Sequence, residues 1–110
     1  MITTHVLDIA RGLPAAGVPV TLELLTVDSG WALLGQGETD ADGRLRTLSP
    51  PGLAAGTYRL SFDTAAYFAR LKLAAFYPEV RIVFSVTERD AQFHLPLLLA
   101  PYGYSTYRGS

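Results

Sequence analysis

The segment VPVTLELL, residues 18–25, shows the pattern that decides the fold class of this chain. Apolar side chains occupy every second position, and proline, threonine and glutamate stand between them. Successive side chains of a β-strand point to opposite faces, so a period of two predicts a strand with one buried face. The side chains expected on that buried face are Val18, Val20, Leu22 and Leu24.

The same alternation recurs in YRLSFD at residues 58–63 and in VRIVFSV at residues 80–86. Glycine and proline separate these segments, and Asp42-Gly43 is a strong signal for a β-hairpin. Many short strands at such regular spacing are typical of an all-β sandwich. We expect strands near Val6, Leu22, Leu33, Leu45, Leu60, Val83, Leu97 and Tyr104.

One segment, DTAAYFARLKL at residues 63–73, does not alternate in this way. Its alanines and phenylalanine favour a helix, and Thr64 can serve as the N-terminal cap. We therefore expect one short helix over about residues 64–71. The helix cannot continue through Pro78, because the residue before a proline avoids helical geometry.

Two segments are apolar on both faces: HVLDIA at residues 5–10 and HLPLLLA at residues 94–100. In a two-layer sandwich only one face of a strand contacts the core, so the other face needs separate cover. One interpretation is a partner subunit, which agrees with a hydrophobic content of 49% in so short a chain. The other is a central strand whose outer face is covered by the helix or a loop.

Composition sets further limits on the class of protein. The 110 residues suit a single domain, residues 1–110, and a net charge of −1 without a basic stripe argues against nucleic acid as a partner. The absence of cysteine excludes disulfides, thiolate metal sites and cysteine nucleophiles. We find neither a signal peptide nor an apolar run long enough to cross a membrane, which predicts a cytoplasmic protein without membrane association.

The chain has two histidines, His5 and His94, one in each doubly apolar segment. The terminal strands of a sandwich often pair, so the two rings are expected to lie close together. Histidine is the side chain best suited to move protons near neutral pH. A lone histidine is more often a packing or surface residue. The functional interpretation is favoured because both histidines lie on strands that are apolar on both faces.

Arginine is the second candidate group. Arg44 directly follows the Asp42-Gly43 turn, and turns and loops often carry function, although a solvated arginine is the simpler interpretation. Arg46 has the same strand parity and competes for any role. A metal held by both histidines and Asp8 has unconvincing spacing, so we expect no metal and no cofactor. The motifs of serine hydrolases, P-loop proteins, dinucleotide-binding proteins and zinc proteases are absent from the sequence.

Four motifs follow one another along the chain: HVLD with GLPA at residues 5–8 and 12–15, TDADGR at 39–44, YPE at 77–79 and HLPLLLAPYGYSTYRGS at 94–110. In this order they closely resemble the 5-hydroxyisourate hydrolases, the transthyretin-related enzymes of urate breakdown. The resemblance spans essentially the whole chain. It departs from the family pattern at Gln92, where many members have histidine, at Tyr77, where phenylalanine is usual, and at Ala100, where serine is common.

The resemblance implies a transthyretin-like sandwich of two four-stranded sheets with one short helix, assembled as a homotetramer from two dimers. The active sites would lie in a channel where the dimers meet, with the C-terminal tail folded into it. The residues implied as catalytic are His5, Arg44, His94 and Ser110. Those implied as binding substrate are His5, Arg44, Tyr107 and Arg108.

The implied reaction is hydrolysis of 5-hydroxyisourate to 2-oxo-4-hydroxy-4-carboxy-5-ureidoimidazoline. His94, with His5 as its partner, would activate water, and Arg44 would stabilise the oxyanion; the division of roles between the histidines stays open. Two alternatives are a hormone carrier like transthyretin and a generic β-sandwich adhesion or repeat domain. The terminal YRGS together with both histidines and Arg44 favours the enzyme, because transthyretin proper lacks them.

Overall fold

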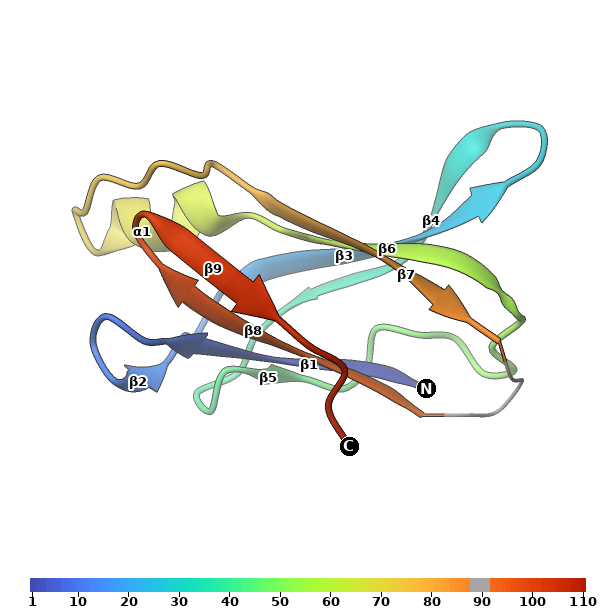
Figure 1. Ribbon diagram of the computed structural model, residues 1–110, viewed down its shortest axis with the longest axis horizontal. Coiled ribbons are helices and arrows are strands. Elements are labelled where there is room, and N and C mark those ends of the chain that lie inside the picture. Colours follow the sequence, from blue (N-terminus) through green and yellow to red (C-terminus); the bar gives the residue numbers. More distant parts are fainter. Residues whose placement is uncertain (88–91) are drawn as a thin grey trace.

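The computed structural model describes residues 1–87 and 92–110, which form two facing β-sheets with one short helix at the end of the sandwich (Figure 1). The predicted all-β sandwich is therefore confirmed. The elements are β1 Ile2–Asp8, β2 Leu13–Pro14, β3 Pro19–Thr26, β4 Gly30–Glu38, β5 Arg44–Leu45, β6 Gly56–Phe62, α1 Thr64–Arg70, β7 Val80–Val86, β8 Phe93–Ala100 and β9 Gly103–Thr106.

One sheet, called sheet B here, has the order β4-β3-β6-β7 and is antiparallel throughout. The alternation read from residues 18–25 is confirmed, because Val20 and Leu22 are buried while Thr21 and Glu23 are only partly covered. Strand β6 alternates in the same way and buries Tyr58, Leu60 and Phe62. These inward side chains meet those of the opposite sheet in the core.

The other sheet, sheet A, has the order β2-β1-β8-β9, and β5 also pairs with β1. It has five strands rather than the expected four, because two residues, Leu13 and Pro14, pair with the end of β1. Strands β1 and β8 run parallel, from Ile2 opposite Phe93 to Asp8 opposite Leu99. The two ends of the chain thus meet in the middle of one sheet.

Helix α1 is confirmed close to its expected bounds, but its cap is not the predicted residue. Asp63 is the N-cap, and its carboxylate accepts a hydrogen bond from the Ala66 backbone N–H at 3.0 Å. Thr64 is buried, and its hydroxyl instead donates to the Tyr77 carbonyl at 2.8 Å. Thr64 is thus the first residue of the helix, and its side chain makes a tertiary contact with the segment before β7. No helix in the described part of the chain is long and apolar enough to cross a membrane.

The Asp42-Gly43 signal marks a tight turn, but the hairpin prediction was wrong. The Asp40 carboxylate accepts hydrogen bonds from the backbone N–H groups of Asp42 and Arg44, at 2.9 and 3.0 Å. The strands on either side then belong to different sheets, because β4 pairs with β3 whereas β5 pairs with β1. The Val6 N–H also binds the Gly43 carbonyl, at 2.7 Å, so the turn is attached to the edge of β1.

Replacing Gly43 with alanine is expected to destabilise the protein. Gly43 has φ +78°, and a Cβ there would lie 2.3 Å from the Val6 carbonyl oxygen. Gly12→Ala is the matched control, because Gly12 has φ +71° with nothing within 4 Å of the added carbon. We expect the left-handed backbone to cost about 1–2 kcal/mol in either variant, with a further loss in Gly43→Ala alone. Equal denaturation midpoints for the two variants would show that the turn moves away freely.

Candidate functional site on the outer face of sheet A

Strand alternation and register bring the candidate groups to the outer face of sheet A. In β1 the residues at even positions are buried, so Thr3 and His5 lie on the opposite face. In β8 the leucines at 95, 97 and 99 are buried, which places His94 outside as well. The register then sets Thr3 beside His94 and His5 beside Arg44.

His94 is half-buried and held at several points. Its Nδ1 lies 2.8 Å from the Thr3 hydroxyl, and its backbone carbonyl accepts a hydrogen bond from the Gly109 N–H at 2.7 Å. Burial lowers the pKa of His94, and the charges of Arg44, His5 and Arg46 lower it further. The imidazole is therefore neutral near pH 7, which is the form that accepts a proton from water.

His5 and Arg44 lie side by side next to the turn before β5. His5 Nε2 is 2.9 Å from the Asp42 carbonyl oxygen, and because a carbonyl only accepts, this nitrogen carries a proton. The pKa of Asp40 is lowered, chiefly because its carboxylate accepts a hydrogen bond from the Arg44 backbone N–H. Burial opposes this effect, and the Asp42 N–H and the charges of Arg46 and Arg44 lower the pKa further. The anionic Asp40 thus holds the turn that positions Arg44.

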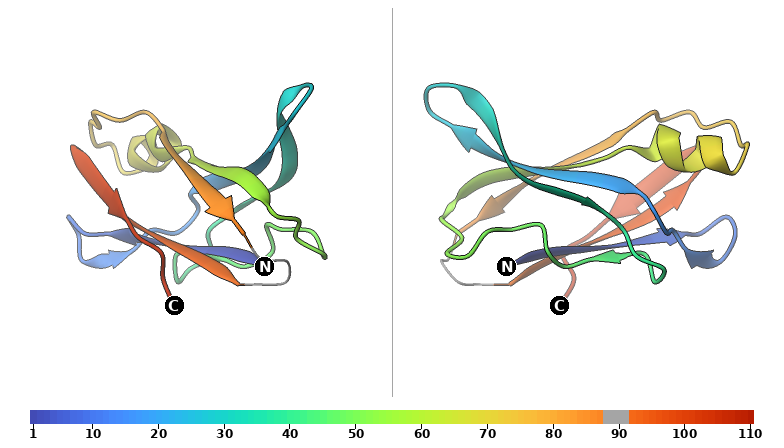
Figure 2. Two further views of the ribbon diagram at one scale, coloured as in Figure 1. Left: turned by 45° about the vertical axis from the view of Figure 1, so that its right-hand side comes forward. Right: turned by 180° about the vertical axis from the view of Figure 1, so that it is seen from behind.

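The C-terminal tail completes the site. It passes over the outer face of sheet A and ends on the side away from sheet B (Figures 1 and 2). Gly109 forms a bridge with His94 and packs so closely that a Cβ on it would lie 2.6 Å from His94 Cδ2. The tail is held by the strand that carries the histidine, which explains why a terminus this polar and aromatic is ordered.

Two adjoining hollows share Met1, Thr3, Gln92, His94 and Ser110 in their walls. Their volumes are about 330 and 250 Å³, so together they fall within the usual range for small-molecule sites. The further residues of the first are Arg108 and Gly109, and those of the second are Thr4, Arg44 and Arg46.

Most of the predicted site residues therefore gather in one place. His94, Arg44, Arg108 and Ser110 line the hollows, and His5 lies beside Arg44. Tyr107 is 58% exposed and lies apart, in a hollow at the open edge between β7 and β8. The Arg108 guanidinium also leans that way, 4.6 Å above the Phe93 ring.

Sequence reasoning did not single out Thr3, and it ranked Arg46 only as a competitor of Arg44. Both line the same hollow as His94. The parity of Thr3 with His5 was visible in the sequence, but its position opposite His94 depends on pairing between residues 91 positions apart. No local pattern carries that information.

Asp8 is not available to the histidines, because it points to the inner face of sheet A. Its carboxylate accepts hydrogen bonds from the Tyr67 hydroxyl at 2.7 Å and the Arg11 N–H at 3.0 Å. Burial and this contact with Asp8 raise the pKa of Tyr67 to about 12. Residues 1–87 and 92–110 contain no group of three histidine, aspartate or glutamate side chains that could hold a metal.

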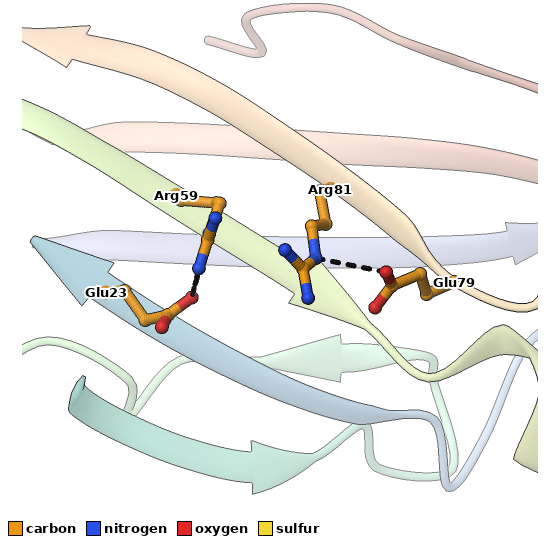
Figure 3. Close-up of polar contacts among 4 residues, drawn as sticks. All are labelled: Glu23, Arg59, Glu79 and Arg81. Atoms are coloured by element: carbon orange, nitrogen blue, oxygen red, sulfur yellow. Dashed lines mark hydrogen bonds and ion pairs between the residues drawn. The ribbon is translucent and has the colours of Figure 1, made fainter. Parts of the chain in front are cut away.

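The outer face of sheet B has a broad groove of a different kind. Four of its charged side chains form two ion pairs, with Arg59 2.8 Å from Glu23 and Arg81 3.2 Å from Glu79 (Figure 3). By contrast, no hydrogen bond or ion pair with another described residue engages the guanidinium of Arg44 or Arg46. These two cations can therefore meet an anionic ligand without first breaking a contact.

Fold and site together define a β-sandwich protein with a cationic, histidine-containing candidate site beside its C-terminal tail. The HIUase/Transthyretin family model matches residues 2–109. The 5-hydroxyisourate hydrolase of Salmonella typhimurium is 47% identical over 111 residues, covering 100% of this chain and 81% of the relative. The chain belongs to the HIUase/Transthyretin family.

Solved structures of both kinds of family member resemble this chain. The structure of Klebsiella pneumoniae 5-hydroxyisourate hydrolase superposes with a TM-score of 0.86 and 41% identity, covering 99% of this chain and 98% of that one. The structure of sea bream transthyretin in complex with thyroxine superposes with a TM-score of 0.90 and 33% identity, covering 98% of this chain and 93% of that one. A fold shared this closely by a hydrolase and a thyroxine-bound transthyretin means that side chains at the site must decide function.

Proposed function

We propose that this protein hydrolyses 5-hydroxyisourate to 2-oxo-4-hydroxy-4-carboxy-5-ureidoimidazoline, an enzymatic step of urate degradation. The observation that carries the proposal is the neutral His94 beside two unengaged guanidinium groups and the chain's own C-terminus. The 47% identity with a 5-hydroxyisourate hydrolase over the whole chain supports the same conclusion.

In the proposed mechanism His94 takes a proton from water as the water oxygen attacks the acyl carbon of the six-membered ring. Arg44 holds the oxygen on which negative charge develops, because a guanidinium offers parallel donors to such groups. The C–N bond then breaks, and the proton passes to the leaving nitrogen through His94 or its partner His5. Arg108 and Ser110 shape the pocket with hydrogen bonds, and Tyr107 is assigned to binding the planar ring.

The direct test is the decay of freshly made 5-hydroxyisourate, followed by ultraviolet absorbance with and without protein. We expect the protein to accelerate decay far above the spontaneous rate, in proportion to its concentration. Decay at the spontaneous rate, with the protein folded by circular dichroism, would reject the enzyme and favour a carrier.

We also propose a homotetramer built from two dimers. Strands β7 and β9 each pair on one side only within the described part of the chain, and the hollow that contains Tyr107 is lined by residues of β7 and β8 and by Thr106 of β9. Val83 on β7 is 58% exposed, an apolar side chain on an open edge. Pairing at these edges would form the dimer, and the outer faces of sheet A would meet between dimers. Light scattering tests the assembly, and we expect the mass of four chains. The cytoplasmic location stays a separate prediction.

The pH dependence of turnover is expected to report the charge around His94. Because its pKa is lowered, His94 stays neutral below its ordinary pKa of 6.5, and we expect the acid limb of kcat to have its midpoint below that value. Arg46→Gln removes one cation and should move the midpoint upward. Arg81→Gln, on the outer face of sheet B, is the control and should leave it unchanged. An acid limb that does not respond to Arg46→Gln would mean that another group sets it.

A further inference from the structure

We propose that Thr3 is a positioning residue, whose hydroxyl holds Nδ1 of His94 and directs Nε2 into the hollow. The catalytic role of Thr3 rests on the proposed hydrolysis. The contact between Thr3 and His94 is seen in the structure and does not depend on it. Thr3 lines both hollows, half-buried, at the point where β1 and β8 pair.

The His94 ring is restrained on both sides of its attachment atom. On one side the Thr3 hydroxyl lies 2.8 Å from Nδ1. On the other side Gly109 approaches Cδ2, where even a methyl group would lie 2.6 Å from the ring carbon. Nδ1 and Cδ2 are the two ring atoms bonded to Cγ, so holding both leaves only the Cε1–Nε2 end free. Nε2 is therefore the nitrogen available to a water molecule.

The two adjacent threonines of β1 have different roles. Thr4 is buried, and its hydroxyl donates to the Leu95 carbonyl at 2.6 Å, which ties β1 to β8 on the inner face. Thr3 also pairs with β8, but its side chain faces outward. The hydrogen-bond partner of its hydroxyl is His94 Nδ1. A β-branched side chain has few χ1 rotamers, so little entropy is lost in holding this hydroxyl against the ring.

A hydroxyl suits this position because it can accept a hydrogen bond without adding charge. When His94 acts as a base, Nδ1–H donates to Thr3 Oγ1 and Nε2 presents its lone pair. When Nε2 has taken a proton, Nδ1–H still donates to the same oxygen. The contact therefore persists through the proton transfer, whereas a carboxylate in its place would favour the protonated ring and raise its pKa.

The kinetic test compares Thr3→Val, which removes the hydroxyl while keeping the shape, with Thr3→Ser, which keeps the hydroxyl. We expect Thr3→Val to lower kcat about tenfold, the rate equivalent of one neutral hydrogen bond, with little change in KM. Thr3→Ser should restore most of the rate. Thr21→Val, on the outer face of sheet B, is the matched control and should behave as the parent.

The second readout is the nitrogen NMR spectrum of the imidazoles, which needs no substrate and so separates this inference from the proposed function. The chain has two histidines, so a His5→Gln background isolates His94. We expect the Nδ1–H tautomer of His94 in the parent and in Thr3→Ser, and a mixture of tautomers in Thr3→Val. An unchanged tautomer in folded Thr3→Val, or a Thr3→Ser variant as slow as Thr3→Val, would overturn the inference.

Discussion

Replacing His94 with glutamine is expected to lower kcat by about 10²–10⁴-fold, the usual contribution of a positioned general base. Glutamine keeps a polar side chain of similar reach, but it cannot accept a proton from water. The neutral state of His94 near pH 7 follows from burial and from the nearby cations, so the parent protein has its base ready at working pH. The measurement is steady-state decay of fresh 5-hydroxyisourate at saturating substrate.

This loss should occur without unfolding, because His94 faces away from the core. Its strand is anchored by buried leucines on the inner face, including Leu97 at 0% exposure. Gln92→Ala is a suitable control, since Gln92 lines the same hollows but does not titrate. We expect it to retain most activity, with both variants melting near the parent. Near-normal turnover by His94→Gln would reject the assignment of His94 as the base.

Replacing Arg44 with glutamine is expected to lower kcat by about 10²–10³-fold, the typical effect of removing one donor to a developing oxyanion. Arg44 is half-buried, and the turn before β5 holds its backbone through Asp40. Its guanidinium is free of internal partners among the described residues, so its charge is available to the ligand. Arg44→Lys should restore only part of the rate, because an ammonium group is a point charge without parallel donors.

Arg46→Gln is the matched control for this prediction. Arg46 lines the same hollow, lies two residues further along, and also lowers the pKa of His94. It lies outside the two residues of β5 that pair with β1, and it is more exposed than Arg44. We expect a much smaller loss of kcat above pH 7 for Arg46→Gln. If the two variants lost activity equally, the oxyanion role would have to be shared between them.

Much of the fold was predictable because β-strands carry a local signal. The alternation in residues 18–25, 58–63 and 80–86 assigned the buried faces correctly, and the helix fell where the alternation stopped. The errors lie where a distant contact competed with a local one. Asp63 caps the helix while the Thr64 hydroxyl binds the Tyr77 carbonyl, and no hairpin forms at Asp42-Gly43 because β1 takes the strand that follows.

The site was only partly predictable from residue types and from the resemblance. The sequence nominated His5, Arg44, His94, Arg108 and Ser110, and the structure brings them to one region of sheet A. Tyr107 lies outside the two hollows in the single chain, and its role in binding stays a prediction. Thr3 could not be ranked, because a threonine in a strand has no distinguishing local pattern.

By itself, the sequence determined which residues form strands, which faces they bury, and which side chains could carry proton transfer and bind negative charge. These properties depend on neighbours one or two positions away, through the period of the strand and the chemistry of each side chain. Only the tertiary structure decided that β1 lies parallel to β8, that Thr3 meets His94, and that Gly109 closes over the ring. Those contacts join the two ends of the chain, and core packing and register across sheet A set them rather than any local preference.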